Sequence, residues 1–335
     1  MIVGVDGTPL TVSSGGVRTY TEELTRALRA EFPEDEYVTM SDQFQPLKGL
    51  DRRWWTIGVQ RYMSRIGVDV FHGTDFSVPY MPMRPSVLTL HDLSPWMNRG
   101  WHHAADRVRR RTPLLIKLGI PTMILTDAEA VRRQAIEHFK IQPDRVAAVH
   151  LAAREEFRPV ETPPPDRPYF VFVGTIEPRK NVPALIDAWQ PLSGEADLII
   201  AGRMRADAPR IEPRPGMNIL GEVPDAQLPR LYSSAVACVY PSEYEGFGLP
   251  VLEAMQCGTA VITSRDPAVV EVSGGAAIHV DTAGLFGAME TLLRNPEERA
   301  RRRELSLRRA AEFSWRATAR KTHQVYEEAC RRFHG

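Results

Sequence analysis

The sequence predicts an α/β protein of two domains, each built around a parallel sheet, on three observations. The chain has 335 residues, of which 43% are apolar, and this length suits two cores of about 150 residues each. Short apolar runs rich in β-branched residues alternate with longer segments of helical period, which is typical of βα units. The alternation breaks at residues 161–168, where three consecutive prolines favour an extended connector, and then restarts. We therefore expect domains at residues 1–163 and 164–314.

Alternating elements account for most of the first domain. Its expected strands are residues 2–6, 37–40, 68–72, 87–91, 123–126 and 146–149. Helices are expected between these strands at residues 17–31, 54–66 and 128–139.

The second domain repeats this alternation. Its expected strands are residues 169–173, 198–201, 218–220, 237–240 and 261–263, and its expected helices are residues 182–189, 225–234 and 249–256. About forty residues at the C-terminal end are helical in pattern, rich in Arg and Glu, and contain no expected strand.

Composition excludes several classes of protein. The 42 basic residues balance 42 acidic ones, so the chain lacks the basic excess of a general nucleic-acid binder. The three cysteines, Cys238, Cys257 and Cys330, fit neither a disulfide scaffold nor a zinc pattern, which predicts a reducing cytoplasmic setting. No run reaches the roughly 18 apolar residues of a membrane span, and the N-terminus lacks a signal pattern. We expect a chain that neither spans a membrane nor is exported.

Small or polar residues follow nearly every expected strand. They are Gly7, His72, Gly73, His91, Asp92, Thr126, Asp127, Gly174, Thr175, Gly202, Arg203, Pro241, Ser242, Thr263 and Ser264. Any one of them could be an ordinary polar loop residue. Because ligands bind beyond the carboxyl ends of parallel strands, the set predicts a ligand-binding edge in each domain.

The segment at residues 241–258, PSEYEGFGLPVLEAMQCG, combines several features of a ligand site. Gly246 and Gly248 allow close backbone approach, and Pro250 suits the first turn of a helix, whose N-terminus attracts anions. Glu245 precedes this helix and Glu253 lies about one turn inside it. A carboxylate suits a vicinal diol such as a ribose. Taken singly, Glu253 could instead compensate the helix dipole, and Glu245 could be a solvated charge.

Glu245 and Glu253 are separated by seven residues, and with the intervening GFGLPVL they resemble the E-x7-E motif of the GT-B glycosyltransferases of family 4. The likeness extends over most of the chain in a fixed order. Its other segments are SGGVRTYTEEL (14–24), VDVFHG (68–73), TLHDLS (89–94), VGTIEPRKN (173–181), LGEVPD (220–225), TSRDPAVVEVSGGAA (263–277) and FSW (313–315).

The resemblance implies a GT-B fold, in which two Rossmann-like domains with parallel sheets face a central cleft. The first domain would bind the acceptor and the second the nucleotide sugar, with the helix at 315–335 packing back on the first. A hexose would pass to a glycan or lipid-linked acceptor with retention of anomeric configuration, by a metal-independent front-face mechanism. The GT-EPRKN form of this motif resembles the mannosyltransferase-like branch of the family. It favours mannose as the transferred sugar and GDP-mannose as the donor, and a UDP-sugar is the alternative donor.

The resemblance also implies roles for residues of the second domain. Glu253 would hold the ribose hydroxyls, and Glu245 with the backbone of residues 247–249 would meet the transferred sugar and the phosphates. Lys180, with Arg179 beside it, would neutralise the leaving diphosphate, as departure of that group requires. Many relatives carry an arginine where this chain has Thr175, so Arg179 or Arg203 would share the phosphate role. The implied catalytic residues are His91, Glu245, Lys180 and Arg179, and the implied donor-binding residues are Gly15, Gly16, Gly174, Thr175, Arg203, Val223, Phe247, Gly248, Leu249 and Glu253.

Two features of the first domain fit the same scheme. Gly15 and Gly16 begin an expected helix and could present amides to phosphates, or form a plain tight turn. His91, at a strand end, resembles the family histidine that contacts the donor sugar, and His72 is a weaker candidate for that role.

No metal site or cofactor is expected. The chain lacks an Asp-x-Asp triplet and a His-Glu-x-x-His pattern, and it also lacks G-x-G-x-x-G and Walker A loops. Other GT-B activities, such as a phosphorylase or a nucleotide-sugar epimerase, and a non-catalytic glycan- or nucleotide-binding module are the alternatives.

Basic and apolar residues crowd residues 107–118. They include Arg107, Arg109, Arg110, Arg111, Lys117, Leu114, Leu115, Ile116 and Leu118. Relatives with lipid-linked acceptors dock on membranes through such elements, so a peripheral contact with the cytoplasmic membrane face is one interpretation. A solvated arginine face over a core helix, interrupted at Pro113, is the other.

Overall fold

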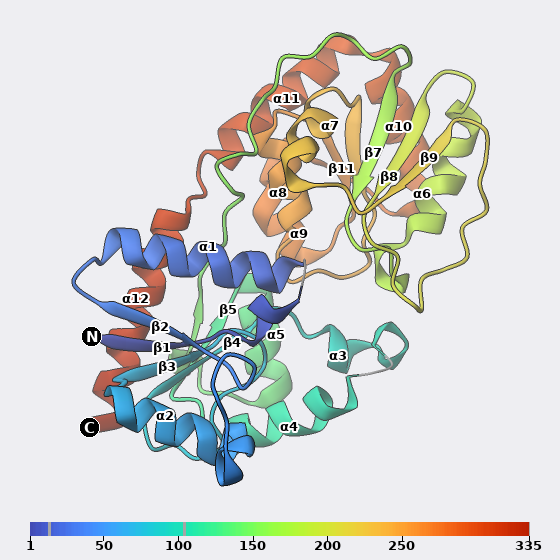
Figure 1. Ribbon diagram of the computed structural model, residues 1–335. Helices are drawn as coiled ribbons and strands as arrows, with labels where there is room; N and C mark the ends of the chain where they lie inside the picture. The colour runs from blue at the N-terminus through green and yellow to red at the C-terminus, as the bar shows by residue number, and fades with distance from the viewer. Residues whose placement is uncertain (13–14, 103–104, 335) are drawn as a thin grey trace. The chain divides into compact units, whose positions relative to one another are not determined.

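The computed structural model describes residues 1–12, 15–102 and 105–334. The chain forms two compact units, which are residues 1–151 with 314–335 (unit 1) and residues 152–313 (unit 2). Most helices and strands of each unit are labelled in Figure 1.

Unit 1 contains a six-stranded parallel sheet of order β2-β1-β3-β4-β5-β6. The strands are β1 (Ile2–Asp6), β2 (Glu36–Met40), β3 (Val70–Gly73), β4 (Ser86–Leu90), β5 (Met123–Thr126) and β6 (Val146–Ala148). Its helices are α1 (Gly16–Glu31), α2 (Val59–Ile66), α3 (Ser94–Met97), α4 (Asp106–Lys117), α5 (Glu129–Phe139) and α12 (Trp315–His334). Every residue of β3, β4 and β5 is buried, as expected for central strands covered on both faces.

The helix α12 lies far along the chain from the rest of unit 1 and packs beside α1 (Figure 1). Its His323 donates from Nε2 to the carboxylate of Asp35 at 2.7 Å and stacks on the ring of Phe32 with centroids 3.8 Å apart. Arg316 forms an ion pair with Glu31 at 2.9 Å. The core of unit 1 is therefore completed by the C-terminal residues 315–334.

Unit 2 also has a six-stranded parallel sheet, of order β12-β11-β10-β7-β8-β9. The strands are β7 (Tyr169–Val173), β8 (Asp197–Ala201), β9 (Met217–Gly221), β10 (Ala237–Tyr240), β11 (Val261–Thr263) and β12 (Ile278–His279). The helices are α6 (Val182–Trp189), α7 (Leu228–Ser233), α8 (Leu249–Gln256), α9 (Pro267–Ser273), α10 (Leu285–Arg294) and α11 (Pro296–Ala310).

The boundary between the units lies earlier than the proline-rich connector at which the sequence places it. Residues 152–163 belong to unit 2. Arg154 pairs with Asp225 at 2.8 Å, and the amide of Val160 donates to the hydroxyl of Ser233 at 3.1 Å. Polar contacts therefore hold residues 152–163 against unit 2, and the two compact units divide after residue 151, twelve residues before the end of the first domain expected from the sequence.

Pro113 does not interrupt α4, contrary to the expectation from sequence. A proline leaves the carbonyl four residues earlier without its helical donor. Here that carbonyl belongs to Arg109, and it accepts a hydrogen bond from the indole nitrogen of Trp96 at 3.2 Å. The replacement donor comes from outside the helix, which lets α4 continue to Lys117.

Candidate active site

The predicted donor-binding residues of unit 2 lie at the carboxyl ends of four neighbouring strands. Gly174 and Thr175 follow β7, Arg203 follows β8, Val223 lies shortly after β9, and residues 245–249 follow β10. Because β10, β7, β8 and β9 are adjacent in one parallel sheet, these ends form one continuous edge. This is the edge at which open parallel sheets bind ligands.

The backbones after β7 and β8 approach each other closely. Gly202 has φ 139°, and a Cβ placed on it would lie 2.0 Å from the carbonyl oxygen of Gly174. The amide of Ile176 donates to the carbonyl of Arg203 at 2.8 Å. Only glycine fits at position 202, and the two loops therefore present their side chains to the same region.

The helix α8 begins immediately beyond this region. Gly248 occupies its N-cap with φ 96°, a left-handed conformation that favours glycine, and among the described residues no side chain caps the first turn. Phe247 is buried and meets Phe313 edge-on, with ring centroids 6.0 Å apart. The loop is thus anchored by a buried ring, and the first amides of α8, at Leu249 and beyond, have the arrangement that binds phosphate groups.

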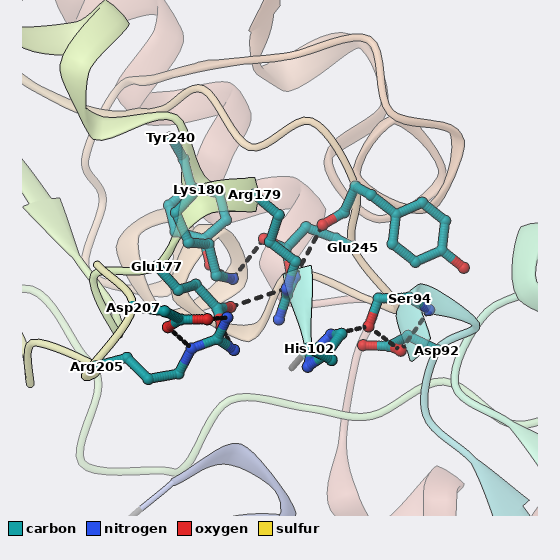
Figure 2. A network of polar contacts seen from close by, with 11 residues as sticks. Asp92, Ser94, His102, Glu177, Arg179, Lys180, Arg205, Asp207, Tyr240 and Glu245 are labelled. Carbon is teal, nitrogen blue, oxygen red and sulfur yellow. Dashed lines mark hydrogen bonds and ion pairs between the residues drawn. The ribbon is translucent and has the colours of Figure 1, made fainter. Parts of the chain in front are cut away.

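Lys180 and Glu245, which are buried, form an ion cluster with the partly exposed Arg179 (Figure 2). The Lys180 ammonium contacts one carboxylate oxygen of Glu245, and Arg179 Nη1 lies 3.0 Å from the other. Lys180 also donates to the hydroxyl of Tyr240, over whose ring its nitrogen lies 4.8 Å from the centroid. Both cations predicted to meet the diphosphate therefore share one carboxylate.

The electrostatics of this cluster favour an ionised carboxylate. Burial alone would raise the pKa of Glu245, but the charges of Lys180 and Arg179 lower that pKa to about 2. Burial and the neighbouring guanidinium of Arg179 lower the pKa of Lys180 against the attraction of Glu245. Glu245 therefore orients Lys180 and Arg179, and partly neutralises their charge, before any diphosphate binds.

A second layer of charge, which the sequence did not reveal, lies behind Arg179. Glu177 is 4% exposed, and its carboxylate lies 2.8 Å from Arg179 Nε and also pairs with Arg205. Arg205 is held in turn by both oxygens of Asp207, one of them at 2.8 Å. Arg203, the candidate from sequence, is exposed. An irregular loop has no period, so nothing in the sequence tells which of the two arginines points inward.

Glu253 lies on α8 and is only partly exposed. Burial raises the pKa of its carboxyl group to about 7, although the nearby charge of Arg154 acts in the opposite direction. A carboxyl group that titrates near neutrality can change its charge when a ligand binds.

In unit 1, α1 begins at Gly16 after Gly15, which has φ 130° and therefore requires glycine. A Cβ at either position would meet nothing within 4 Å among the described residues. The helix has no side-chain cap among these residues. Ser14, the first residue of the matching segment, lies outside the described residues.

His91 directly follows β4 and is held from two sides. Its Nδ1 lies 2.8 Å from a carboxylate oxygen of Asp127, and its Nε2 lies 2.7 Å from the carbonyl oxygen of Thr74. A ring with acceptors at both nitrogens is satisfied best as an imidazolium. Burial opposes the charge, but Asp127 raises the pKa of His91 to about 9. Both ring nitrogens are thus engaged within unit 1.

His72, the weaker candidate, is a core residue. It is fully buried, and its ring nitrogens contact the hydroxyls of Tyr326 and Thr89, both at 2.7 Å. Burial lowers the pKa of His72 to about 3, which keeps the ring neutral. It supports the contact between α12 and the sheet.

The basic segment divides between the two faces of α4. Arg109 and Arg111 turn inward, where Arg111 donates to the hydroxyl of Tyr80 at 2.6 Å. The exposed face carries Arg107, Arg110, Leu114, Lys117 and Leu118, and the two leucines are 55% and 63% exposed. Within the described residues, no helix is long and apolar enough to cross a membrane, and no three His, Cys, Asp or Glu side chains group as metal ligands.

Solved structures with this architecture are glycosyltransferases of the GT-B fold. The sucrose-phosphate synthase of Thermosynechococcus elongatus aligns over 98% of both chains with a TM-score of 0.75 and 18% identity. HepE of Anabaena, solved in complex with UDP and glucose, aligns over 96% of this chain and 98% of its own, with a TM-score of 0.74 and 14% identity.

Sequence comparison gives the family. Residues 153–306 match the family described as glycosyl transferases group 1. The O-antigen chain mannosyltransferase B of Escherichia coli is 32% identical over 284 residues, which cover 77% of this chain and 74% of that protein. The chain therefore belongs to the group 1 glycosyltransferases, and it is an enzyme that transfers sugar.

Proposed function

We propose that this enzyme is a retaining hexosyltransferase that moves mannose, with GDP-mannose as the favoured donor, to a glycan or lipid-linked saccharide. The observation that carries the proposal is the cluster of Lys180, Arg179 and Glu245 at the sheet edge beside the N-terminus of α8. The mannosyltransferase relative supports mannose. The UDP complex of HepE keeps a UDP-sugar as the alternative donor.

Each group in unit 2 has a distinct task in this proposal. The first amides of α8 would bind the diphosphate, and Lys180 and Arg179 would stabilise the charge that grows on it as the glycosidic bond breaks. The carboxylate of Glu253 would accept hydrogen bonds from the ribose hydroxyls. His91 of unit 1 remains the proposed contact to the donor sugar.

Retention follows if the leaving group acts as the base. The bond between the anomeric carbon and the diphosphate oxygen breaks while the acceptor hydroxyl bonds to the same face of that carbon. The departing phosphate oxygen takes the proton of the hydroxyl. Glu245, tied to two cations and with its pKa lowered to about 2, is a weak base and a poor nucleophile, which supports this route.

A thermal-shift panel followed by a hydrolysis assay tests the proposal. A ligand that binds only the folded state raises the melting temperature by mass action, so GDP and GDP-mannose should stabilise more than UDP, ADP and their sugars. The stabilising nucleotide sugar should also be hydrolysed slowly without acceptor. Binding without any turnover would favour a non-catalytic module, and the absence of any nucleotide effect would end the proposal.

We also propose that the exposed face of α4 contacts an anionic membrane when the acceptor is lipid-linked. Arg107, Arg110 and Lys117 flank Leu114 and Leu118 there, a combination that adsorbs to anionic lipid. Sedimentation with phosphatidylglycerol vesicles should capture the protein at low salt. Replacing both leucines by serine should abolish capture. Equal capture by neutral phosphatidylcholine vesicles would contradict the electrostatic part.

A further inference from the structure

Six charged side chains form one alternating row in unit 2 (Figure 2). In order they are Asp207, Arg205, Glu177, Arg179, Glu245 and Lys180. They come from three loops, which follow β7, β8 and β10. The row thus links Lys180 and Arg179, the two cations proposed to bind the diphosphate, to Glu177 and Arg205, which have no role in the proposed mechanism so far.

Glu177 creates a problem for the proposed phosphate site. Its carboxylate is almost fully buried and lies 2.8 Å from Arg179 Nε. A buried carboxylate next to a single cation binds it strongly, because water does not screen the pair. If Arg179 were the only cation next to Glu177, the carboxylate would neutralise the positive charge of Arg179. That charge is needed at this position to bind a diphosphate.

Arg205 provides the second cation that Glu177 needs. Its Nη1 pairs with the carboxylate oxygen that does not face Arg179 Nε, so the two arginines take different oxygens of Glu177. Asp207 holds the other edge of the Arg205 guanidinium through both of its oxygens. The planar fork of arginine suits such a double attachment, which a lysine ammonium cannot reproduce.

We infer that Arg205 is a positioning residue for the diphosphate site, because it shares the charge of Glu177 and thereby leaves more of the positive charge of Arg179 available to attract phosphate. Arg205 acts through Glu177 and Arg179, and the inference assigns it no contact with the substrate. This inference rests on the proposed nucleotide-sugar site. If Arg205 only held the loops together, removing the charge of Glu177 would not help the Arg205→Ala variant. The inference instead predicts that removing this charge restores the diphosphate affinity that Arg205→Ala loses.

The test is a double-mutant cycle measured by calorimetry with GDP and GMP, and with UDP and UMP in parallel. Arg205→Ala should weaken nucleoside diphosphate binding by about tenfold, the scale of a lost interaction with a charged group, while monophosphate affinity changes less than twofold. Arg205→Ala combined with Glu177→Gln should recover most of the diphosphate affinity, because the competing charge is gone. Arg210→Ala, which removes an exposed arginine of the same loop between β8 and β9, is the matched control and should bind as the wild type does.

Several results would overturn the inference. They are wild-type diphosphate affinity in Arg205→Ala, a double variant that binds no better than Arg205→Ala, or an equal loss of mono- and diphosphate binding. If Arg205→Ala does not fold, Arg205→Lys replaces it, because lysine keeps the charge but lacks the planar guanidinium. This variant should lose less affinity for the nucleoside diphosphate than Arg205→Ala does, and adding Glu177→Gln should again restore that affinity. A wild-type protein that binds neither GDP nor UDP would refute the proposed function itself, which is a different outcome.

Discussion

Glu253 should make nucleotide binding depend on pH near neutrality. The pKa of its carboxyl group is about 7 in the free enzyme. Only the ionised form accepts hydrogen bonds from both ribose hydroxyls, so binding selects that form. The ionised fraction of a group with this pKa rises from roughly 0.1 at pH 6 to roughly 0.9 at pH 8. Affinity for the matching nucleoside diphosphate should therefore rise about tenfold over this range through Glu253 alone.

Isothermal titration of GDP at pH 6, 7 and 8 measures this rise, and buffers of different ionisation enthalpy count the protons released. About half a proton per ligand should leave Glu253 at pH 7. Glu253→Gln is the control, because it keeps the shape of the side chain but cannot titrate. The titration of the phosphate itself persists in this variant, so the difference between the two proteins isolates Glu253. At pH 8 the variant should bind about 1.5 to 3 kcal/mol more weakly.

Glu253→Gln should weaken nucleotide binding at pH 8 but increase the stability of the folded protein at that pH. The folded-state pKa of Glu253 lies above its ordinary value of 4.5, so the folded protein holds this proton more tightly than the unfolded chain does. Stability is therefore lost as pH rises from about 4.5 to 7. Glu253→Gln should raise the free energy of unfolding at pH 8 by as much as about 3 kcal/mol and have little effect at pH 4.5. Identical pH dependence of binding and stability in both proteins would refute the assignment of Glu253.

Three further predictions concern the rest of the site. Sugar transfer should persist in excess EDTA, since amides and cations are proposed to hold the diphosphate; complete loss restored by Mg²⁺ would contradict this. Lys180→Ala should lower both nucleotide affinity and kcat. Because Glu245 then loses one of its two cationic partners, the free energy of unfolding measured by calorimetry should fall by about 2 kcal/mol. Full activity of this variant would show that Lys180 has no part in the mechanism. His91→Ala should keep affinity for the free nucleoside diphosphate, measured by calorimetry, but lower kcat by about 10²-fold, and a severe loss of nucleotide binding would show that the role given to His91 is wrong.

The sequence predicts the sheets well because their strands are short apolar runs with polar ends. The bounds of β1, β5, β7, β10 and β11 agree with the expected ones. The strand β12 has two residues, which is too short for a periodic pattern. The helix α9 was also missed, although a signal exists: Asp266 precedes Pro267 and caps the amides of Ala268 and Val269 at 3.0 and 3.1 Å.

The structure differs from the expectations where a distant side chain decides the local structure. The indole of Trp96 lets α4 continue past Pro113, and Asp225 holds Arg154 on unit 2. Asparagine is a common capping residue, yet Asn181 occupies the N-cap of α6 with φ 51° and makes no capping hydrogen bond among the described residues. Motif spacing brought Lys180 and Glu245 to one site, but spacing could not show that they bind each other.

The return of α12 to unit 1 sets the order in which the chain can finish folding as it leaves the ribosome. Residues 152–313 form a continuous unit and can be complete as soon as they are synthesised. Residues 1–151 emerge earlier but must wait, because Tyr326 and His323 supply partners for His72 and Asp35. The usual order, in which the N-terminal domain matures first, is therefore reversed here. A stop codon before residue 315 would leave unit 2 whole and unit 1 with one side of its core open to water.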